Sequence, residues 1–114
     1  MSEALKSMKM MMTIVDRDKG DKVKDILCNC GVYFQLIILG EGTAEQETLQ
    51  LLGLSSIEKD IVLSFIEEDN VDEALSQLQG KLELNKRGKG ISCVLDLDCI
   101  GSKKSLQMLL GSSC

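Results

Sequence analysis

The sequence predicts an α+β domain of the ferredoxin-like, split βαβ kind, whose elements follow the order strand, helix, strand, strand, helix, strand. Two observations predict this fold. Short apolar runs typical of strands alternate with two amphipathic helical stripes, and a long polar, glycine-containing insertion separates the second strand from the third. Right-handed crossovers then place both long helices on one face of a four-stranded antiparallel sheet.

The first half of the chain supplies three strands and one helix. Residues 9–15 read as a strand with apolar side chains on both faces, and the polar turn over residues 16–21 leads into a helix. The helix has a clear apolar face, and Gly31 stands where a left-handed terminator is expected. Residues 34–39 and 60–66 form the second and third strands. The apolar face of the helix consists of Val23, Ile26, Leu27 and Cys30.

The second half begins with the most regular helical stripe in the chain, over residues 71–82. Residues 91–100 read as the last strand, and residues 102–110 as a short terminal helix closed by Gly111. Inside the insertion, residues 45–52 have helical composition and Gly53 ends them. The 71–82 stripe is made of Val71, Ala74, Leu75, Leu78 and Leu82.

The composition is that of a single globular domain. Of the 114 residues, 44% are hydrophobic and 27% are charged, which is too apolar for a disordered chain. We therefore expect one domain over residues 9–114, preceded by a loosely held extension over residues 1–8. The net charge of −5 argues against nucleic acid and against anionic membranes as partners.

The cysteines indicate the compartment. Their odd number, five, is not the even set of a secreted disulfide framework, so we expect free thiols and a cytoplasmic location. The apolar run over residues 10–15 is too short for a signal segment or a membrane span. There is no histidine, and the spacing of Cys28 and Cys30 fits neither a zinc nor a redox motif, so no metal site is predicted.

The strands predict a homo-oligomer. In the first three strands both alternating sets of side chains are largely apolar, yet two helices cover only one face of the sheet. The terminal helix is too short to cover the other face alone. We therefore expect the open faces of several sheets to pack together.

Two glycine loops and a local concentration of basic residues suggest a phosphate-bearing small molecule as ligand. The sequence Gly40-Glu41-Gly42-Thr43 follows the second strand, and Gly88-Lys89-Gly90 precedes the fourth. Glycine pairs let backbone N–H groups approach a ligand closely, and basic side chains beside them complement an anion. Each loop taken alone is also compatible with a simple turn. The basic residues are Lys86, Arg87, Lys89, Lys103 and Lys104.

Catalysis has little support in the sequence. Without histidine there is no Ser-His or Cys-His pair, and no phosphate-loop or dinucleotide fingerprint occurs. Asp96 and Asp98 share one face of the last strand, which is better explained by a solvated or subunit edge than by paired catalytic carboxylates. Arg17 follows the first strand, as an acylphosphatase-like enzyme would require, but Asp16 and Asp18 flank it and neutralise its charge. We predict no enzyme activity.

Four segments together resemble the PII nitrogen-regulatory signalling family, of which the chain looks like a divergent member. They are residues 36–42 before a long loop, residues 60–66, residues 71–75 and residues 88–95. The resemblance covers most of residues 9–100. It implies a non-catalytic trimer that binds adenine nucleotides, namely ATP, ADP or AMP, in clefts between subunits and acts on a target protein through a mobile loop, here residues 40–59.

Position by position, Gly40 and Gly42 match the base of the family's mobile loop, Gly88 and Gly90 match its phosphate loop, and Lys104 lies near its basic C-terminal contacts. Three features depart from the family. Ile91 replaces a lysine, the loop lacks the glutamine that helps to hold magnesium and 2-oxoglutarate, and Tyr33 precedes the second strand instead of lying on the loop. The resemblance implies a ligand site at Gly40, Gly42, Thr43, Arg87, Gly88, Lys89, Gly90 and Lys104.

The same fold also serves other functions. An RNA-recognition domain needs exposed aromatic residues and a basic surface, whereas this chain is acidic and 3% aromatic. An oligomeric sensing or structural module of the CutA or ACT kind is the serious alternative. It shares the oligomer and the doubly buried sheet but needs no basic loop for phosphate.

Overall fold

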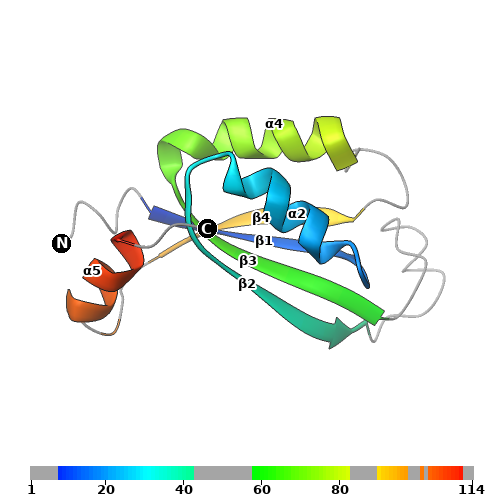
Figure 1. The fold of residues 1–114 in the computed structure, drawn as a ribbon, viewed down its shortest axis with the longest axis horizontal. Coiled ribbons are helices and arrows are strands. Elements are labelled where there is room, and N and C mark those ends of the chain that lie inside the picture. Colours follow the sequence, from blue (N-terminus) through cyan, green and yellow to red (C-terminus); the bar gives the residue numbers. More distant parts are fainter. Residues whose placement is uncertain (1–7, 43–57, 83–89, 98–100, 102, 112–114) are drawn as a thin grey trace.

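The computed structural model describes residues 8–42, 58–82, 90–97, 101 and 103–111, and it confirms the predicted order of strands and helices (Figure 1). A single turn of 3-10 helix leads directly into the second long helix. The elements are β1 (Met8–Asp16), α2 (Gly20–Cys28), β2 (Val32–Glu41), β3 (Glu58–Glu67), η1 (Glu68–Asn70), α4 (Val71–Leu82), β4 (Ile91–Asp96) and α5 (Lys103–Leu110).

The four strands form one sheet in the order β2-β3-β1-β4, and every neighbouring pair is antiparallel. The two edges of the sheet are therefore β2 and β4. At one end of the sheet, which we call the loop end, β1 and β2 finish and β3 and β4 begin. The residues at these strand ends are Asp16, Glu41, Glu58 and Ile91.

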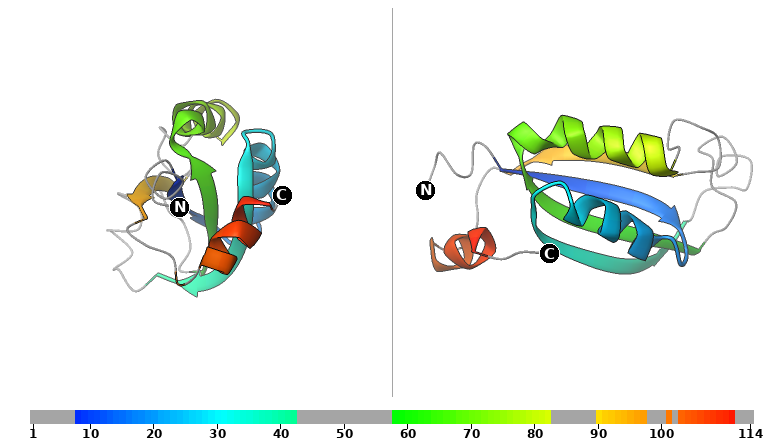
Figure 2. Two further views of the ribbon diagram at one scale, coloured as in Figure 1. Left: turned by 90° about the vertical axis from the view of Figure 1, so that its left-hand side faces the viewer. Right: turned by 45° about the horizontal axis from the view of Figure 1, so that its top comes forward.

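Both long helices pack on one face of the sheet, where the core lies (Figure 2). The alternation of buried side chains along β1 and β3 turns every second residue toward α2 and α4, as the period of a strand requires. No helix of the described residues is long and apolar enough to cross a membrane. The core cluster consists of Met11, Val15, Val23, Ile26, Leu27, Cys30, Val32, Val62, Ile66, Ala74 and Leu78.

The opposite face of the sheet, which we call the open face, is also apolar, as the sequence predicts. Its side chains come from all four strands and stand opposite one another in register, for example Phe34 beside Phe65 and Leu36 beside Leu63. Most of them are half-buried or exposed in the described chain, including Leu36 at 46%. The open-face residues are Met10, Met12, Ile14, Phe34, Leu36, Ile38, Ile61, Leu63, Phe65, Ile91, Cys93 and Leu95.

Several strand boundaries differ from the sequence prediction, and β2 and β3 extend to Glu41 and over Glu58–Glu67, up to two residues beyond their predicted ends. The last strand ends at Asp96 instead of position 100, because β4 pairs only with β1 and Asp96 stands opposite Lys9, near the start of β1. Tyr33 lies inside β2, where an irregular register between Val32 and Phe34 marks a bulge. The first strand begins at Met8, one residue early. Gly31 takes the predicted left-handed conformation, with φ of 75°.

Some predicted features lie outside the described residues. These are residues 1–7 of the extension, the short helix over residues 45–52, Asp98 and, among the predicted ligand contacts, Thr43, Arg87, Gly88 and Lys89.

Candidate functional site

The predicted glycine contacts that the structure describes gather at the loop end, but on opposite edges of the sheet. Gly40 and Gly42 stand at the end of β2, and Gly90 stands directly before β4. Because β3 and β1 lie between these edges and strands are spaced about 4.8 Å apart, the two glycine loops are separated by roughly 14 Å in one chain. Within one chain the two glycine loops therefore do not lie side by side.

Lys104 lies at the other end of the molecule. It is exposed on α5, which contacts β2 beyond the end of the sheet opposite the loop end (Figure 1). Gly90 and α5 are thus separated by the length of β4, about 20 Å for six residues. Within one chain, the structure does not bring Lys104 to either glycine loop.

Gly90 has a structural role besides any contact with a ligand. It is buried, with φ of 112°, a region that only glycine adopts freely. A Cβ atom at this position would lie 2.5 Å from the carbonyl oxygen of Ile14 and 2.9 Å from a methyl carbon of Val15. The glycine therefore lets the start of β4 pack closely on β1.

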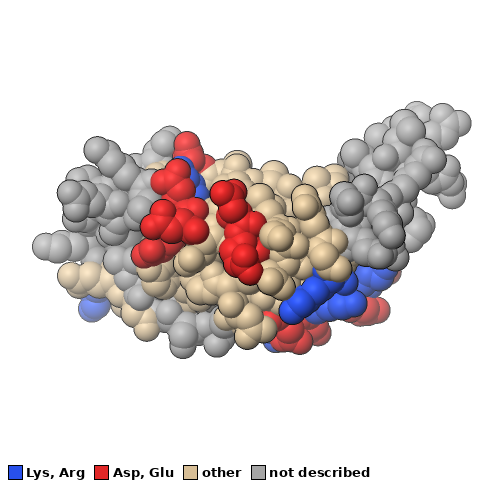
Figure 3. Space-filling view, turned by 90° about the horizontal axis from the view of Figure 1, so that it is seen from above, with Lys and Arg blue, Asp and Glu red and all other residues tan. Residues whose placement is uncertain are grey.

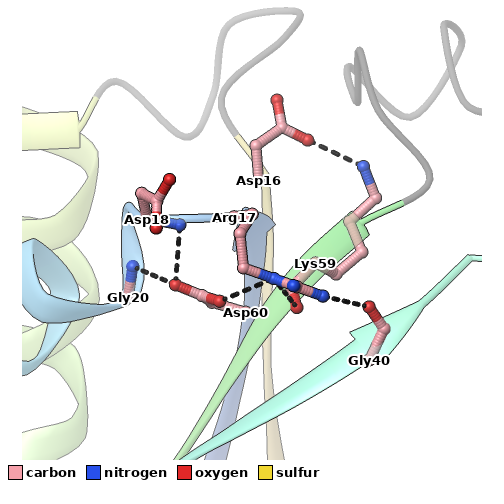
Figure 4. Close-up of polar contacts among 7 residues, drawn as sticks. All are labelled: Asp16, Arg17, Asp18, Gly20, Gly40, Lys59 and Asp60. Carbon is pink, nitrogen blue, oxygen red and sulfur yellow. Dashed lines mark hydrogen bonds and ion pairs between the residues drawn. The ribbon is translucent and has the colours of Figure 1, made fainter.

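A buried carboxylate, that of Asp60 on β3, organises the loop end (Figure 4). Its Oδ2 atom accepts hydrogen bonds from the backbone N–H groups of Asp18 and Gly20, each at 3.0 Å. Gly20 is the first residue of α2 and Asp18 directly precedes its N-cap residue, Lys19, which makes no side-chain capping bond. Asp60 thus caps the helix from another strand, where a negative charge is favourable.

The close approach of the Asp60 carboxylate also explains why glycine stands at position 20. A Cβ atom on Gly20 would lie 2.9 Å from Asp60 Oδ2. Asp18, the residue that donates the other bond, has φ of 77°, and its type is among the few non-glycine residues that tolerate the left-handed region. The local sequence of the β1–α2 turn therefore fits the bound carboxylate.

Arg17 joins this carboxylate to the strand ends. Its Nε atom lies 3.3 Å from Asp60 Oδ1 but directs its hydrogen bond to the carbonyl oxygen of Lys59, so Oδ1 has an ion-pair contact without a hydrogen bond within the described chain. Another guanidinium nitrogen donates to the carbonyl oxygen of Gly40 at 2.9 Å, and the backbone N–H of Arg17 donates to that of Glu58. Arg17 holds the last part of β2 and the first part of β3 together.

A second ion pair lies beside the first, on the open-face side of the sheet. Lys59 Nζ is 2.7 Å from Asp16 Oδ1, and the two residues are direct partners in the β1–β3 ladder. Their side chains are only 4% and 13% exposed. A buried pair of this kind adds little net stability, but removing one partner costs several kcal/mol because the other charge is left buried.

These contacts limit what the loop end can bind. Arg17 and Lys59, the basic residues closest to Gly40 in the described chain, are each already neutralised by a carboxylate. The sequence correctly predicted that the charge of Arg17 is neutralised, but its partner is Asp60 and not Asp16 or Asp18. An acylphosphatase-like role for Arg17 does not fit this arrangement. Phosphate recognition requires cations from elsewhere.

Surface charges of both signs lie on the face that carries α4. Figure 3 shows acidic side chains gathered over the described surface near α4, while Lys and Arg side chains lie toward the loop end beside further acidic ones. The acidic residues of η1 and of the first turn of α4 lie at the end away from the loops, and they include Glu68, Asp69, Asp72 and Glu73. No continuous basic stripe crosses the described part of this face.

Asp96 ends β4, and Asp98, the other carboxylate predicted on this strand, lies outside the described residues. Asp96 is 78% exposed and pairs with Lys9 at 2.6 Å, which raises the pKa of Lys9. This position fits the solvated edge predicted for it. The described residues also contain no group of three or more side chains able to hold a metal ion.

Tyr33, the only tyrosine, gives a spectroscopic prediction. Its hydroxyl donates a hydrogen bond to the Glu67 carboxylate, and this bond, burial and the charge of Glu67 all raise its pKa above the ordinary 10.0. Because the proton is bound more tightly in the folded state, the stability it contributes is present below pH 10 and is lost as the pH rises through the folded pKa. We expect an absorbance titration with a midpoint above 10.0.

The control for this titration uses two neighbouring glutamates. Glu67→Ala should lower the midpoint toward the ordinary value, while Glu68→Ala, which changes an exposed carboxylate next to it, should leave it almost unchanged. A midpoint at or below the ordinary value in the unmodified protein would contradict the prediction.

Comparisons with known proteins identify the fold. No protein-family model matches the sequence, and no curated protein does. Solved structures do match. CPII from Thiomonas intermedia K12, bound to ADP, AMP and acetate, superposes with a TM-score of 0.61 at 18% identity, over 79% of this chain and 85% of that one. PII of Arabidopsis thaliana bound to citrate gives 0.62 at 14% identity, over 87% and 85%. The chain has the PII-like fold.

The chain is also similar to part of a longer protein. A Bacillus cereus protein related to NIF3 matches with a TM-score of 0.61 at 16% identity, over 89% of this chain but only 31% of that one. The resemblance read from the sequence is therefore confirmed at the level of the fold. At these identities, what the relatives bind is a guide for experiment.

Proposed function

We propose that this chain is a PII-like, non-catalytic regulatory protein of the cytoplasm, which binds an adenine nucleotide between the subunits of a homo-oligomer. It acts on a partner protein through residues 40–59, in the control of nitrogen metabolism. The observation that carries the proposal is the combination of a PII-like fold with an apolar open face and two glycine loops at one end of the sheet.

A trimeric ring explains why the predicted contacts are separated within one chain. In a ring each subunit uses two different surfaces, so one edge of a sheet faces the opposite edge of its neighbour. The β2 edge carries Gly40 and Gly42, and the β4 edge carries Gly90. Packing of the open faces inside the ring brings these edges of adjacent subunits together at the loop end, and Lys104 then acts from a neighbouring chain.

The paired charges at the loop end assign the phosphate contacts to other residues. Since Arg17 and Lys59 are neutralised by Asp60 and Asp16, the proposed cations are those of residues 86–89, above all Arg87 and Lys89. The same pairs occupy the carboxylates of Asp16 and Asp60, and the loop lacks the glutamine with which the family helps to hold magnesium, so we propose nucleotide binding without a requirement for magnesium. CPII bound to ADP and AMP supports an adenine nucleotide as the ligand class.

Calorimetry tests this proposal. We expect ATP, ADP or AMP to bind with and without magnesium, and the double variant Arg87→Gln/Lys89→Gln to bind at least about tenfold more weakly for each charge removed, because charge-assisted hydrogen bonds contribute about 1.5–3 kcal/mol. The matched control is Lys19→Gln/Lys22→Gln, which removes two exposed charges from the start of α2 and should bind as the unmodified protein does. Unchanged affinity in the double variant would remove these residues from the site.

The second candidate is an oligomeric sensing or structural module of the CutA or ACT kind. One observation favours it, namely that the basic residues described near Gly40 are already paired inside the protein. The two candidates share the oligomer but differ in the ligand. No heat of binding at millimolar nucleotide, from a protein that assembles normally, would support this module and end the nucleotide proposal.

A further inference from the structure

The β1–α2 turn has the parts of an anion-binding site. It presents two backbone N–H groups at the start of α2, those of Asp18 and Gly20, and the guanidinium of Arg17 beside them (Figure 4). A helix N-terminus with free N–H groups attracts an anion, and a guanidinium adds a matching positive charge. In this protein the anion at that place is a carboxylate of the chain itself.

We propose that Asp60 is the built-in ligand of this anion site, and that its carboxylate thereby fixes the two strand ends that flank residues 43–57. The proposal does not depend on nucleotide binding, since it concerns contacts within one chain. It assigns to Asp60 a positioning role that the charge pattern alone does not reveal.

The fit between carboxylate and site is close. Only 7% of the Asp60 side chain is exposed. Because Gly20 has no side chain, there is space beside it for the Oδ2 atom of Asp60. Oδ1 makes no hydrogen bond in the described chain, and it forms the ion pair with Arg17 Nε at 3.3 Å. The Asp60 carboxylate thus occupies the place of a bound anion while it remains part of β3.

The carboxylate also determines where Arg17 points. With its charge balanced by Asp60, the guanidinium donates to the carbonyl oxygens of Lys59 and Gly40, one on each side of the 43–57 segment. Without the Asp60 carboxylate, we expect the Arg17 guanidinium, which is already 28% exposed, to turn toward water. The strand ends then lose these two side-chain hydrogen bonds, and only the backbone bond from Arg17 to Glu58 still joins the turn to the start of β3.

Rescue by a free anion tests this inference. Asp60→Ala removes the carboxylate and leaves room for formate, which is itself a carboxylate. We expect the melting temperature of Asp60→Ala to fall by roughly 10 °C or more, and formate at constant ionic strength to restore much of that loss with a saturable dependence on concentration. Chloride at the same ionic strength should not restore it, and formate should not change the unmodified protein.

Two further variants separate this role from a general loss of packing. Asp60→Asn keeps the volume filled, so it should be destabilised without being rescued by formate. In Arg17→Gln/Asp60→Ala the site lacks its guanidinium, and rescue should be lost. If Asp60→Ala folds only when formate is present, the inference is supported; if formate fails to fold or stabilise it, or if the double variant is rescued equally, the inference is wrong.

Hydrogen exchange provides a readout at the strand ends. Backbone amides of residues 40–42 and 58–60 should exchange faster in Asp60→Ala and slow again with formate, while those of α5 at the far end should not change. Uniform acceleration over the whole chain, with no difference between the two ends, would show that Asp60 has only a general structural role.

Discussion

Replacing Leu63 with aspartate should convert the proposed oligomer into folded monomers. Leu63 lies in the middle of the open face, on an inner strand, directly opposite Leu36 on one side and Met12 on the other. In a separate chain this position is half-buried on a face that water reaches, so a carboxylate can be hydrated there. Inside packed sheets it would be buried without a partner.

The expected effect on assembly is large. Burying an unpaired charge costs several kcal/mol in each subunit, which weakens association by a factor on the order of a thousand or more. Light scattering at micromolar concentration should therefore give an oligomer mass for the unmodified protein and a monomer mass for Leu63→Asp. Circular dichroism should show that the variant keeps its strands and helices.

A matched control places the same charge elsewhere. Gln79 is exposed on α4, on the helix-covered side of the sheet, so Gln79→Asp should assemble as the unmodified protein does. A monomer mass for the unmodified protein would end the oligomer hypothesis, and an intact Leu63→Asp oligomer would show that subunits associate through another surface.

The same substitution, glycine to alanine, should have opposite effects at positions 90 and 80. At Gly90 a Cβ atom would overlap the Ile14 carbonyl oxygen, and the backbone has φ of 112°. We expect Gly90→Ala to destabilise the protein by about 2–5 kcal/mol, the sum of left-handed strain and forced displacement of β1. At Gly80, in the exposed part of α4, nothing lies within 4 Å of an added Cβ atom.

Gly80→Ala should accordingly stabilise the protein by about 0.5–1 kcal/mol, because alanine loses less backbone entropy in a helix. Urea unfolding of both variants measures the two signs directly. Similar values for the two substitutions would contradict the packing of β4 on β1 through Gly90. The result also bears on ligand experiments, since a Gly90 variant that fails to bind nucleotide has not by itself identified a contact.

The fold was predictable because it follows from local periodicity. The helix over residues 71–82 has the predicted bounds, since its stripe repeats without interruption. The two apolar faces of the sheet were predictable because strand side chains alternate strictly. The end of β4 was not, since it depends on where β1 begins, and this is a property of pairing between distant segments.

At the loop end, too, the local features were predictable from the sequence and the contacts between distant segments were not. The glycine loops were visible in the sequence, whereas the pairing of Arg17 with Asp60 joins residues 43 positions apart, and only the register of the sheet brings them together. A signal was nevertheless present. The consecutive charges Lys59 and Asp60 stand near the start of an apolar strand, and charges placed there need partners.

The register of the β2–β3 ladder has a consequence for the way this fold varies. The ladder continues to Glu41 opposite Glu58, so the chain leaves and re-enters the sheet at adjacent points that are already held in place. Closing a longer connection between fixed points costs only about 0.6 kcal/mol for each doubling of its length. The connection between Glu41 and Glu58 is therefore a point at which segments of different length and sequence can replace one another while the sheet stays the same.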